Sequence, residues 1–166
     1  MRAFTPLSLL LLLLGLSLPG TTQAQAPVQP MRWAQAKEII ANNESELLIV
    51  NFWATWCVPC VRELPAFQQV ADEYRDQGVR LLLVSLDFEE DMEKRVLPFV
   101  QNKGLQEYEI LLITNDDANA WLGQVDESWS GAIPATLLVD NQGNYLDFHE
   151  AMMTYDELKE FIHPYL

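Results

Sequence analysis

The sequence predicts an α/β fold in which helices cover both faces of a central parallel sheet. Three short apolar runs, 48–53, 79–86 and 108–114, have the length and the aliphatic content of buried strands. Amphipathic helical patterns at 59–76 and 92–103 separate these runs. Strands that alternate with helices in this way form parallel sheets with helix layers on both sides.

The helices in the first half of the chain have recognisable ends. A first helix is predicted at 31–41, where apolar residues recur at helical spacing, and the polar segment 42–45 ends it. The next helix begins at Pro59, and Gly78 follows its end. Pro65 lies inside this helix and is expected to kink it.

The last third of the chain predicts a short helix, a hairpin and a final helix. The short helix is expected at 118–125. After Pro134, two strands at 135–140 and 145–149 flank an Asn-Gln-Gly turn, which is typical of a tight hairpin. The final helix is expected at 154–162.

The N-terminal segment predicts export. Residues 1–26 have the pattern of a signal peptide, with Arg2 before the apolar run 7–18 and small residues around an expected cleavage site near Ala24. Retention of this segment as an anchor is the alternative. Residues 27–166 suit one compact domain, so we expect a periplasmic, single-domain protein.

The charge of the chain excludes some partners. The formal net charge is -14, and Arg2 is the one charged residue in the leader, so removal of the leader changes it from -14 to -15. A surface this acidic repels nucleic acid and anionic lipid. We therefore expect no nucleic-acid partner, and we expect a monomer.

The two cysteines, Cys57 and Cys60, are the only ones in the sequence, so any disulfide within one chain joins them. They lie on the turn between the strand that ends at Trp53 and the helix that begins at Pro59. A helix N-terminus favours thiolate over thiol. We expect Cys57, nearer the tip, to attack a partner disulfide and Cys60 to resolve the mixed disulfide.

Other uses of the pair have less support. A structural disulfide across so short a loop removes little entropy from the unfolded chain. Structural zinc needs two more ligands, and His149 and His163 are too far apart in sequence for a finger, so no metal site is expected. A peroxidase would need a threonine and arginine pocket that the sequence does not indicate. A Cu(I) metallochaperone stays open, because two thiolates bind Cu(I) and Met152 and Met153 add soft ligands.

The motif and its surroundings resemble a known family. Residues 51–65, NFWATWCVPCVRELP, are similar to the active site of the TlpA/ResA-type thioredoxin-like proteins, and residues 131–136, GAIPAT, are similar to the cis-proline loop of that family. The resemblance implies a thioredoxin fold: a central mixed sheet flanked by helices, with a strand–helix insertion before the cis-proline loop. It also implies that Pro134 is cis and, with Ile133, faces the cysteines on the substrate side.

The resemblance also implies roles for residues around the cysteines. Spacing alone places Glu63 one helical turn after Cys60, where a solvated glutamate is the simplest interpretation. The family instead has a glutamate here that tunes the thiols and relays protons. Asn51 departs from ordinary thioredoxin, which has an aspartate, and asparagine is not a base. Asn51 and Pro59 are therefore predicted to support the active site, and Trp56 to stay partly exposed and dock a partner, whereas Trp53 belongs in the core.

The residues between the cysteines predict the direction of the reaction. Val58 and Pro59 carry no polar or charged group that would stabilise a thiolate strongly, so we expect a reductase. The resemblance implies protein disulfide substrates, such as apocytochrome c or copper-site cysteines, and a membrane electron donor of the DsbD/CcdA type. The redox-active disulfide of Cys57 and Cys60 is the expected working group, with no other cofactor.

Overall fold

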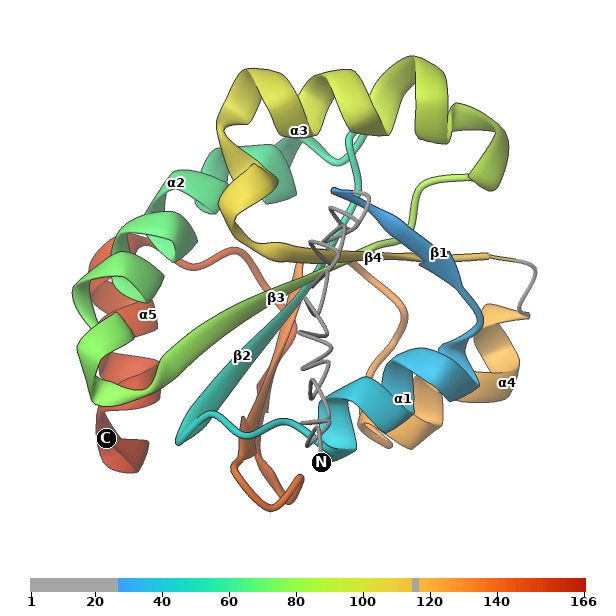
Figure 1. The fold of residues 1–166 in the computed structure, drawn as a ribbon. Helices are drawn as coiled ribbons and strands as arrows, with labels where there is room; N and C mark the ends of the chain where they lie inside the picture. The colour runs from blue at the N-terminus through green and yellow to red at the C-terminus, as the bar shows by residue number, and fades with distance from the viewer. Residues whose placement is uncertain (1–26, 115–116) are drawn as a thin grey trace, which may run out of the picture.

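The computed structural model describes residues 27–114 and 117–166, and the predicted signal peptide at 1–26 lies outside them (Figure 1). Within the described residues, the centre is a mixed sheet of six strands in the order β1-β4-β3-β2-β5-β6. The strands are β1 (Gln29–Met31), β2 (Leu47–Trp53), β3 (Val79–Ser85), β4 (Glu109–Ile113), β5 (Ala135–Asp140) and β6 (Tyr145–His149).

Helices cover both faces of this sheet, as predicted. Side chains of α2, α3 and α5 join the core on one face, and side chains of α1 and α4 join the core on the other. The helices are α1 (Trp33–Ala41), α2 (Val58–Glu73), α3 (Leu97–Lys103), α4 (Ala118–Val125) and α5 (Tyr155–Ile162). The predicted helix at 92–103 is a π-helical turn, Met92–Val96, followed by α3.

The strand directions explain how the sheet becomes mixed. Strands β1, β4, β3 and β2 are parallel to one another, whereas β5 runs antiparallel to both β2 and β6. Two strand–helix units, β3–α3 and β4–α4, lie between α2 and the proline loop that precedes β5. The expected insertion is therefore present.

Strand β1 was not predicted from the sequence, and the first helix begins later than predicted. Residues 29–31 pair in parallel with β4, and α1 starts at Trp33 rather than at Met31. Three residues that include Pro30 carry no alternation signal, because their strand conformation comes from pairing with β4. Helix α2 continues through Pro65 and ends at Glu73, slightly before the predicted position.

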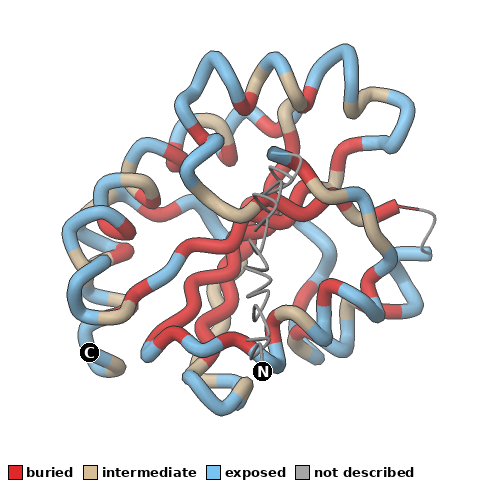
Figure 2. Tube along the Cα trace, viewed as in Figure 1, coloured by how far each residue is buried: buried red, intermediate tan, exposed pale blue. Residues whose placement is uncertain are grey.

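Strand β2 is buried along its whole length (Figure 2). Its side chains alternate between the two faces, as the geometry of a strand requires. Leu47, Ile49 and Trp53 belong to the core under α2, whereas Leu48 and Phe52 belong to the opposite core. By the same alternation, the side chain of residue 51 lies on the α2 face.

The opposite core is built on aromatic rings. The ring centroids of Trp33 and Trp121 are 4.7 Å apart, as are those of Phe52 and Trp129. Offset and tilted aromatic pairs of this kind add about 0.5–1.5 kcal/mol each beyond area burial. The cluster holds Trp129, whose indole N–H donates to the carbonyl of Ala132 at 2.8 Å. It therefore anchors the loop that leads to β5.

The hairpin between β5 and β6 turns at Gly143, as predicted from its Asn-Gln-Gly sequence. Gly143 has φ of +77°, and a Cβ atom there would lie 2.3 Å from the carbonyl oxygen of Ala41 at the end of α1. The turn thus needs glycine for two reasons, backbone conformation and close approach.

We predict that Gly143→Ala destabilises the protein more than Gly104→Ala. Gly104 also has a positive φ, +66°, but a Cβ atom added there would meet no neighbouring atom within 4 Å. Backbone strain alone should cost about 1 kcal/mol at Gly104, whereas the added clash should bring the cost at Gly143 to at least about 2–3 kcal/mol. Urea unfolding of both variants measures the difference, and equal losses would contradict the close approach.

Candidate active site

The two cysteines lie at the N-terminus of α2, where they form a disulfide with an S–S distance of 2.01 Å. Cys57 is the N-cap residue, and the backbone N–H of Cys60 lies 3.3 Å from its sulfur. Pro59 occupies the first turn, where its missing N–H and fixed φ suit a helix start. The pair therefore sits at the positive end of the helix dipole, as the sequence predicted.

The two sulfurs differ in access. Cys57 is 5% exposed and Cys60 is fully buried, so an incoming disulfide reaches Cys57 first. Trp56, which precedes Cys57, is 52% exposed, and Val58 is also exposed. Trp53 is buried in the core under α2. Both tryptophan placements agree with the sequence analysis, and Trp56 and Val58 form an apolar rim beside Cys57.

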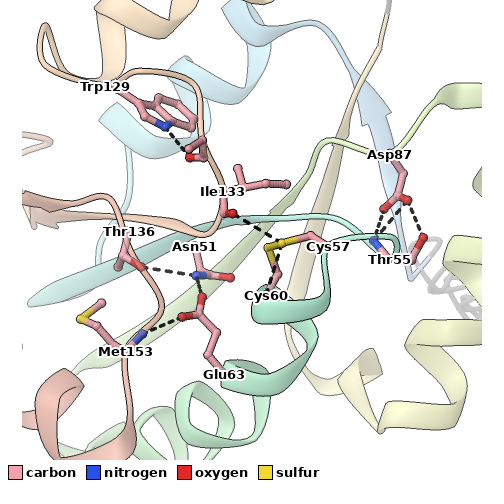
Figure 3. Close-up of a disulfide and its surroundings, with 11 residues drawn as sticks. Asn51, Thr55, Cys57, Cys60, Glu63, Asp87, Trp129, Ile133, Thr136 and Met153 are labelled. Carbon is pink, nitrogen blue, oxygen red and sulfur yellow. Dashed lines mark hydrogen bonds between the residues drawn. A yellow bond between two sulfur atoms is a disulfide. The ribbon is translucent and has the colours of Figure 1, made fainter.

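The proline loop faces the cysteines, as Figure 3 shows. The Ile133–Pro134 peptide bond is cis, which confirms the prediction from the sequence. The carbonyl oxygen of Ile133 lies 3.6 Å from Sγ of Cys57. Since a disulfide sulfur carries no proton, this is a contact in the oxidised protein that becomes a hydrogen bond if Cys57 is a thiol.

Glu63 lies inside the protein rather than on a solvated helix face. It is 2% exposed, and its Oε1 accepts from Nδ2 of Asn51 at 2.8 Å. Its Oε2 accepts from the backbone N–H of Met153 at 2.9 Å. Burial raises the pKa of Glu63 to about 7, although these two hydrogen bonds act in the opposite direction. The carboxyl group therefore exchanges a proton near neutral pH.

Asn51 connects Glu63 to the strand that follows the cis proline. Besides Glu63, its Nδ2 donates to Oγ1 of Thr136 at 3.3 Å. Asn51 and Thr136 are register partners on β2 and β5, and both are fully buried. Asn51 was predicted to support the site, whereas no role was predicted for Thr136 or for the backbone of Met153. Thr136 stood in the cis-proline motif, whereas a backbone N–H leaves no signal in a sequence.

A second buried carboxylate, Asp87, was also missed. It accepts from the backbone N–H of Thr55 at 2.9 Å, from the hydroxyl of Thr55 at 2.5 Å and from the hydroxyl of Ser85 at 2.8 Å. Thr55 lies two residues before Cys57, and Asp87 lies two residues after β3. Asp87 therefore ties the cysteine turn to the neighbouring strand (Figure 3). A polar residue just after a buried strand was the available signal.

Two negative findings apply to the described parts of the chain. Among residues 27–114 and 117–166, no group of three or more His, Cys, Asp or Glu side chains is placed to hold a metal ion. Across the same residues, every helix is too short or too polar to cross a bilayer.

Comparison with known proteins identifies the family of this chain. The model of the AhpC/TSA family matches residues 24–145, which is more than half of the chain. The chain belongs to the AhpC/TSA family. Sporulation thiol-disulfide oxidoreductase A of Bacillus subtilis is 29% identical over 163 residues, covering 93% of this chain and 94% of that protein.

Other relatives agree with the predicted resemblance. Thiol-disulfide oxidoreductase ResA of Oceanobacillus iheyensis is 29% identical over 124 residues, which cover 74% of this chain; the match spans 59% of the ResA length. A solution structure of a thioredoxin-like protein from Porphyromonas gingivalis is 31% identical and has a TM-score of 0.56, covering 74% of this chain and 77% of that one. The ResA-type resemblance and the thioredoxin fold are thus confirmed.

We predict that Glu63 makes the stability of the oxidised protein fall as pH rises from about 4.5 to about 7. The pKa of Glu63 is raised from 4.5 to about 7 by folding, so the native state keeps a proton that the unfolded state has lost. A shift of this size corresponds to about 3 kcal/mol. The difference in free energy of unfolding between wild type and Glu63→Gln should therefore change by about 3 kcal/mol between about pH 4.5 and about pH 7. A constant difference would contradict the buried carboxyl group.

We predict that Asp87→Asn lowers the free energy of unfolding by about 2 kcal/mol. The amide cannot accept on both sides, so either a partly buried donor of Thr55 or the buried hydroxyl of Ser85 loses its partner. Asp117→Asn is the matched control, because Asp117 is an exposed N-cap and asparagine caps helices equally well. Chemical denaturation of both variants makes the comparison. Equal, small effects would show that Asp87 does not hold the turn.

Proposed function

We propose that this protein is an exported thiol:disulfide reductase that acts on disulfides of other proteins. The observation that carries the proposal is the Cys57–Cys60 disulfide at the N-terminus of α2, opposite the cis peptide bond of Pro134. The named relatives are thiol-disulfide oxidoreductases, which supports the same reaction class.

The reaction uses the dithiol form. The thiolate of Cys57 attacks a substrate disulfide, its S–S bond breaks, and one substrate sulfur leaves as thiolate while the other is bonded to Cys57. Cys60 loses its proton to Glu63 and attacks Cys57, which releases the second substrate sulfur. Two electrons pass to the substrate, and the product is the disulfide present in this structure. A membrane electron donor of the DsbD/CcdA type then reduces Cys57 and Cys60 again.

The surface around Cys57 suits an extended protein substrate. Trp56 and Val58 supply apolar contact area, and the backbone carbonyl of Ile133 beside Cys57 offers a hydrogen-bond acceptor to a passing chain. Pro134 itself is buried, whereas Ile133 before it is partly exposed. We infer that substrates lie between the α2 tip and this loop.

The sequence supports the proposed direction and location. Val58 and Pro59 place no charged or polar side chain between the cysteines, which favours a reducing couple. A dithiol protein with the leader at 1–26 works in the periplasm, where thiols that must stay reduced need a dedicated electron supply. Apocytochrome c, or the cysteines of a copper site, are the proposed substrates, and the protein acts as a monomer.

A Cu(I) metallochaperone remains the second candidate, because two thiolates in a C-x-x-C turn bind Cu(I). The adjacent methionines differ in placement: Met153 packs in the core with the cysteines, and Met152 is exposed. Met153 therefore has a packing role that needs no copper.

We predict that the Cys57–Cys60 couple has a reduction potential near or below about -250 mV, because nothing between the cysteines stabilises the thiolate strongly. Equilibration in dithiothreitol buffers measures it. A value near about -120 mV, typical of strong oxidants, would overturn the reductase proposal. Equilibrium dialysis with Cu(I) tests the alternative. The chaperone is favoured if the Cys57→Ser, Cys60→Ser double variant loses Cu(I) binding and the wild type has no disulfide reductase activity.

A further inference from the structure

One buried polar atom beside the disulfide has no partner in the oxidised protein. Nδ2 of Asn51 donates to Glu63 and Thr136, but Oδ1 of Asn51 is buried and accepts no hydrogen bond. Buried acceptors are nearly always paired. In Figure 3 the amide nitrogen of Asn51 faces Glu63 and Thr136, and its oxygen is turned toward the cysteine pair.

Reduction of the disulfide supplies the missing donor. A disulfide sulfur has no hydrogen, whereas a reduced Cys60 carries an S–H group. Cys60 is fully buried and lies on the face of the sheet that receives the side chain of Asn51. The thiol of Cys60 is thus positioned on the side of the amide where an acceptor is free.

Glu63 and Thr136, which contact the amide of Asn51, can each act as hydrogen-bond donor or acceptor. A carboxylate accepts hydrogen bonds, but a protonated carboxyl group donates one, and a threonine hydroxyl does either. Half a turn of the Asn51 amide exchanges its oxygen and nitrogen with little change of shape. Both Glu63 and Thr136 can therefore remain hydrogen-bonded to Asn51 in either orientation.

We propose that Asn51 is a positioning residue that couples the protonation of Cys60 to that of Glu63 by turning its amide over. This inference rests on the proposed function. With Glu63 ionised, Nδ2 donates to Glu63, and Oδ1 accepts from the Cys60 thiol. With Glu63 protonated, Oδ1 accepts from Glu63, and Nδ2 donates to the Cys60 thiolate. One proton is then held by one group or the other.

The coupling serves the release of the mixed disulfide. The S–H bond of Cys60 breaks, its electron pair stays on sulfur, and an O–H bond forms on Glu63. The thiolate attacks Cys57, the bond between Cys57 and the substrate sulfur breaks, and the substrate sulfur leaves with the electron pair. Asn51 stabilises the reactants and the products of the proton transfer in turn.

The groups that hydrogen-bond to Glu63 are uncharged, so its proton exchange is with the cysteines. The sheet presents Asn51 and Thr136, the segment before α5 presents the N–H of Met153, and α2 itself carries Cys57 and Cys60. No salt bridge to Glu63 occurs among the described residues. The pKa of about 7 that burial produces allows Glu63 to give and take the proton at neutral pH.

A titration of Cys60 tests the proposal. In a Cys57→Ser background Cys60 is the single thiol, and thiolate absorbance against pH gives its acid dissociation constant. Glu63→Gln should increase this constant, and Asn51→Leu should reduce that increase about tenfold, which is one pKa unit. A purely coulombic effect of Glu63 would stay equal or grow when the polar amide is removed. That result would overturn the proposal.

Two further variants keep the test decisive if Asn51→Leu does not fold. Thr136→Val removes the hydroxyl that must reverse, so it should weaken the coupling in the same direction, and undiminished coupling would overturn the proposal. Ile49→Val, a conservative change on the same face of β2, should leave it intact. Because the titration uses no substrate, reductase activity of wild type is read separately. Coupling without activity refutes only the proposed function, and activity without coupling refutes only this inference.

Discussion

The pairing of β2 with β3 on one side and β5 on the other is the constraint on which the site depends. The chain leaves β2 into the turn that carries the cysteines, and it enters β5 from the cis-proline loop. Because the two strands are antiparallel neighbours, the C-terminal end of β2 and the beginning of β5 lie side by side at the same end of the strands. The disulfide and the Ile133 carbonyl face each other for this reason.

The two cores support the cysteine turn and the cis-proline loop from opposite faces of the sheet. On one face, α2 packs its apolar stripe against β2 and buries Cys60 and Glu63 with it. On the other, the aromatic cluster holds Trp129, which fixes the loop before the cis proline through the carbonyl of Ala132. Asp87 adds a third connection, from β3 to the turn at Thr55. The reactive turn is thus supported by elements far apart in sequence.

Burial of a small polar network gives the site its acid–base character. Glu63, Asn51 and Thr136 lie between sheet and helix, where water does not replace a lost hydrogen bond. The low polarity raises the pKa of Glu63, and the limited set of partners ties the orientation of one amide to the charge of its neighbours. The same arrangement on a solvated helix face would leave Glu63 an ordinary surface glutamate.

The sequence by itself determined the main elements and the disulfide pair, because strand and helix periodicity are local and only two cysteines exist. The cis form of Pro134 was implied only by the resemblance of residues 131–136. Spacing alone placed Glu63 on a solvated face, and only the resemblance of residues 51–65 pointed to its role. Tertiary structure decided that Glu63 is buried, that β1 forms, and that Asp87, Thr136 and the Met153 N–H meet the active site. These features depend on strand pairing and on contacts between distant segments, which no local pattern contains.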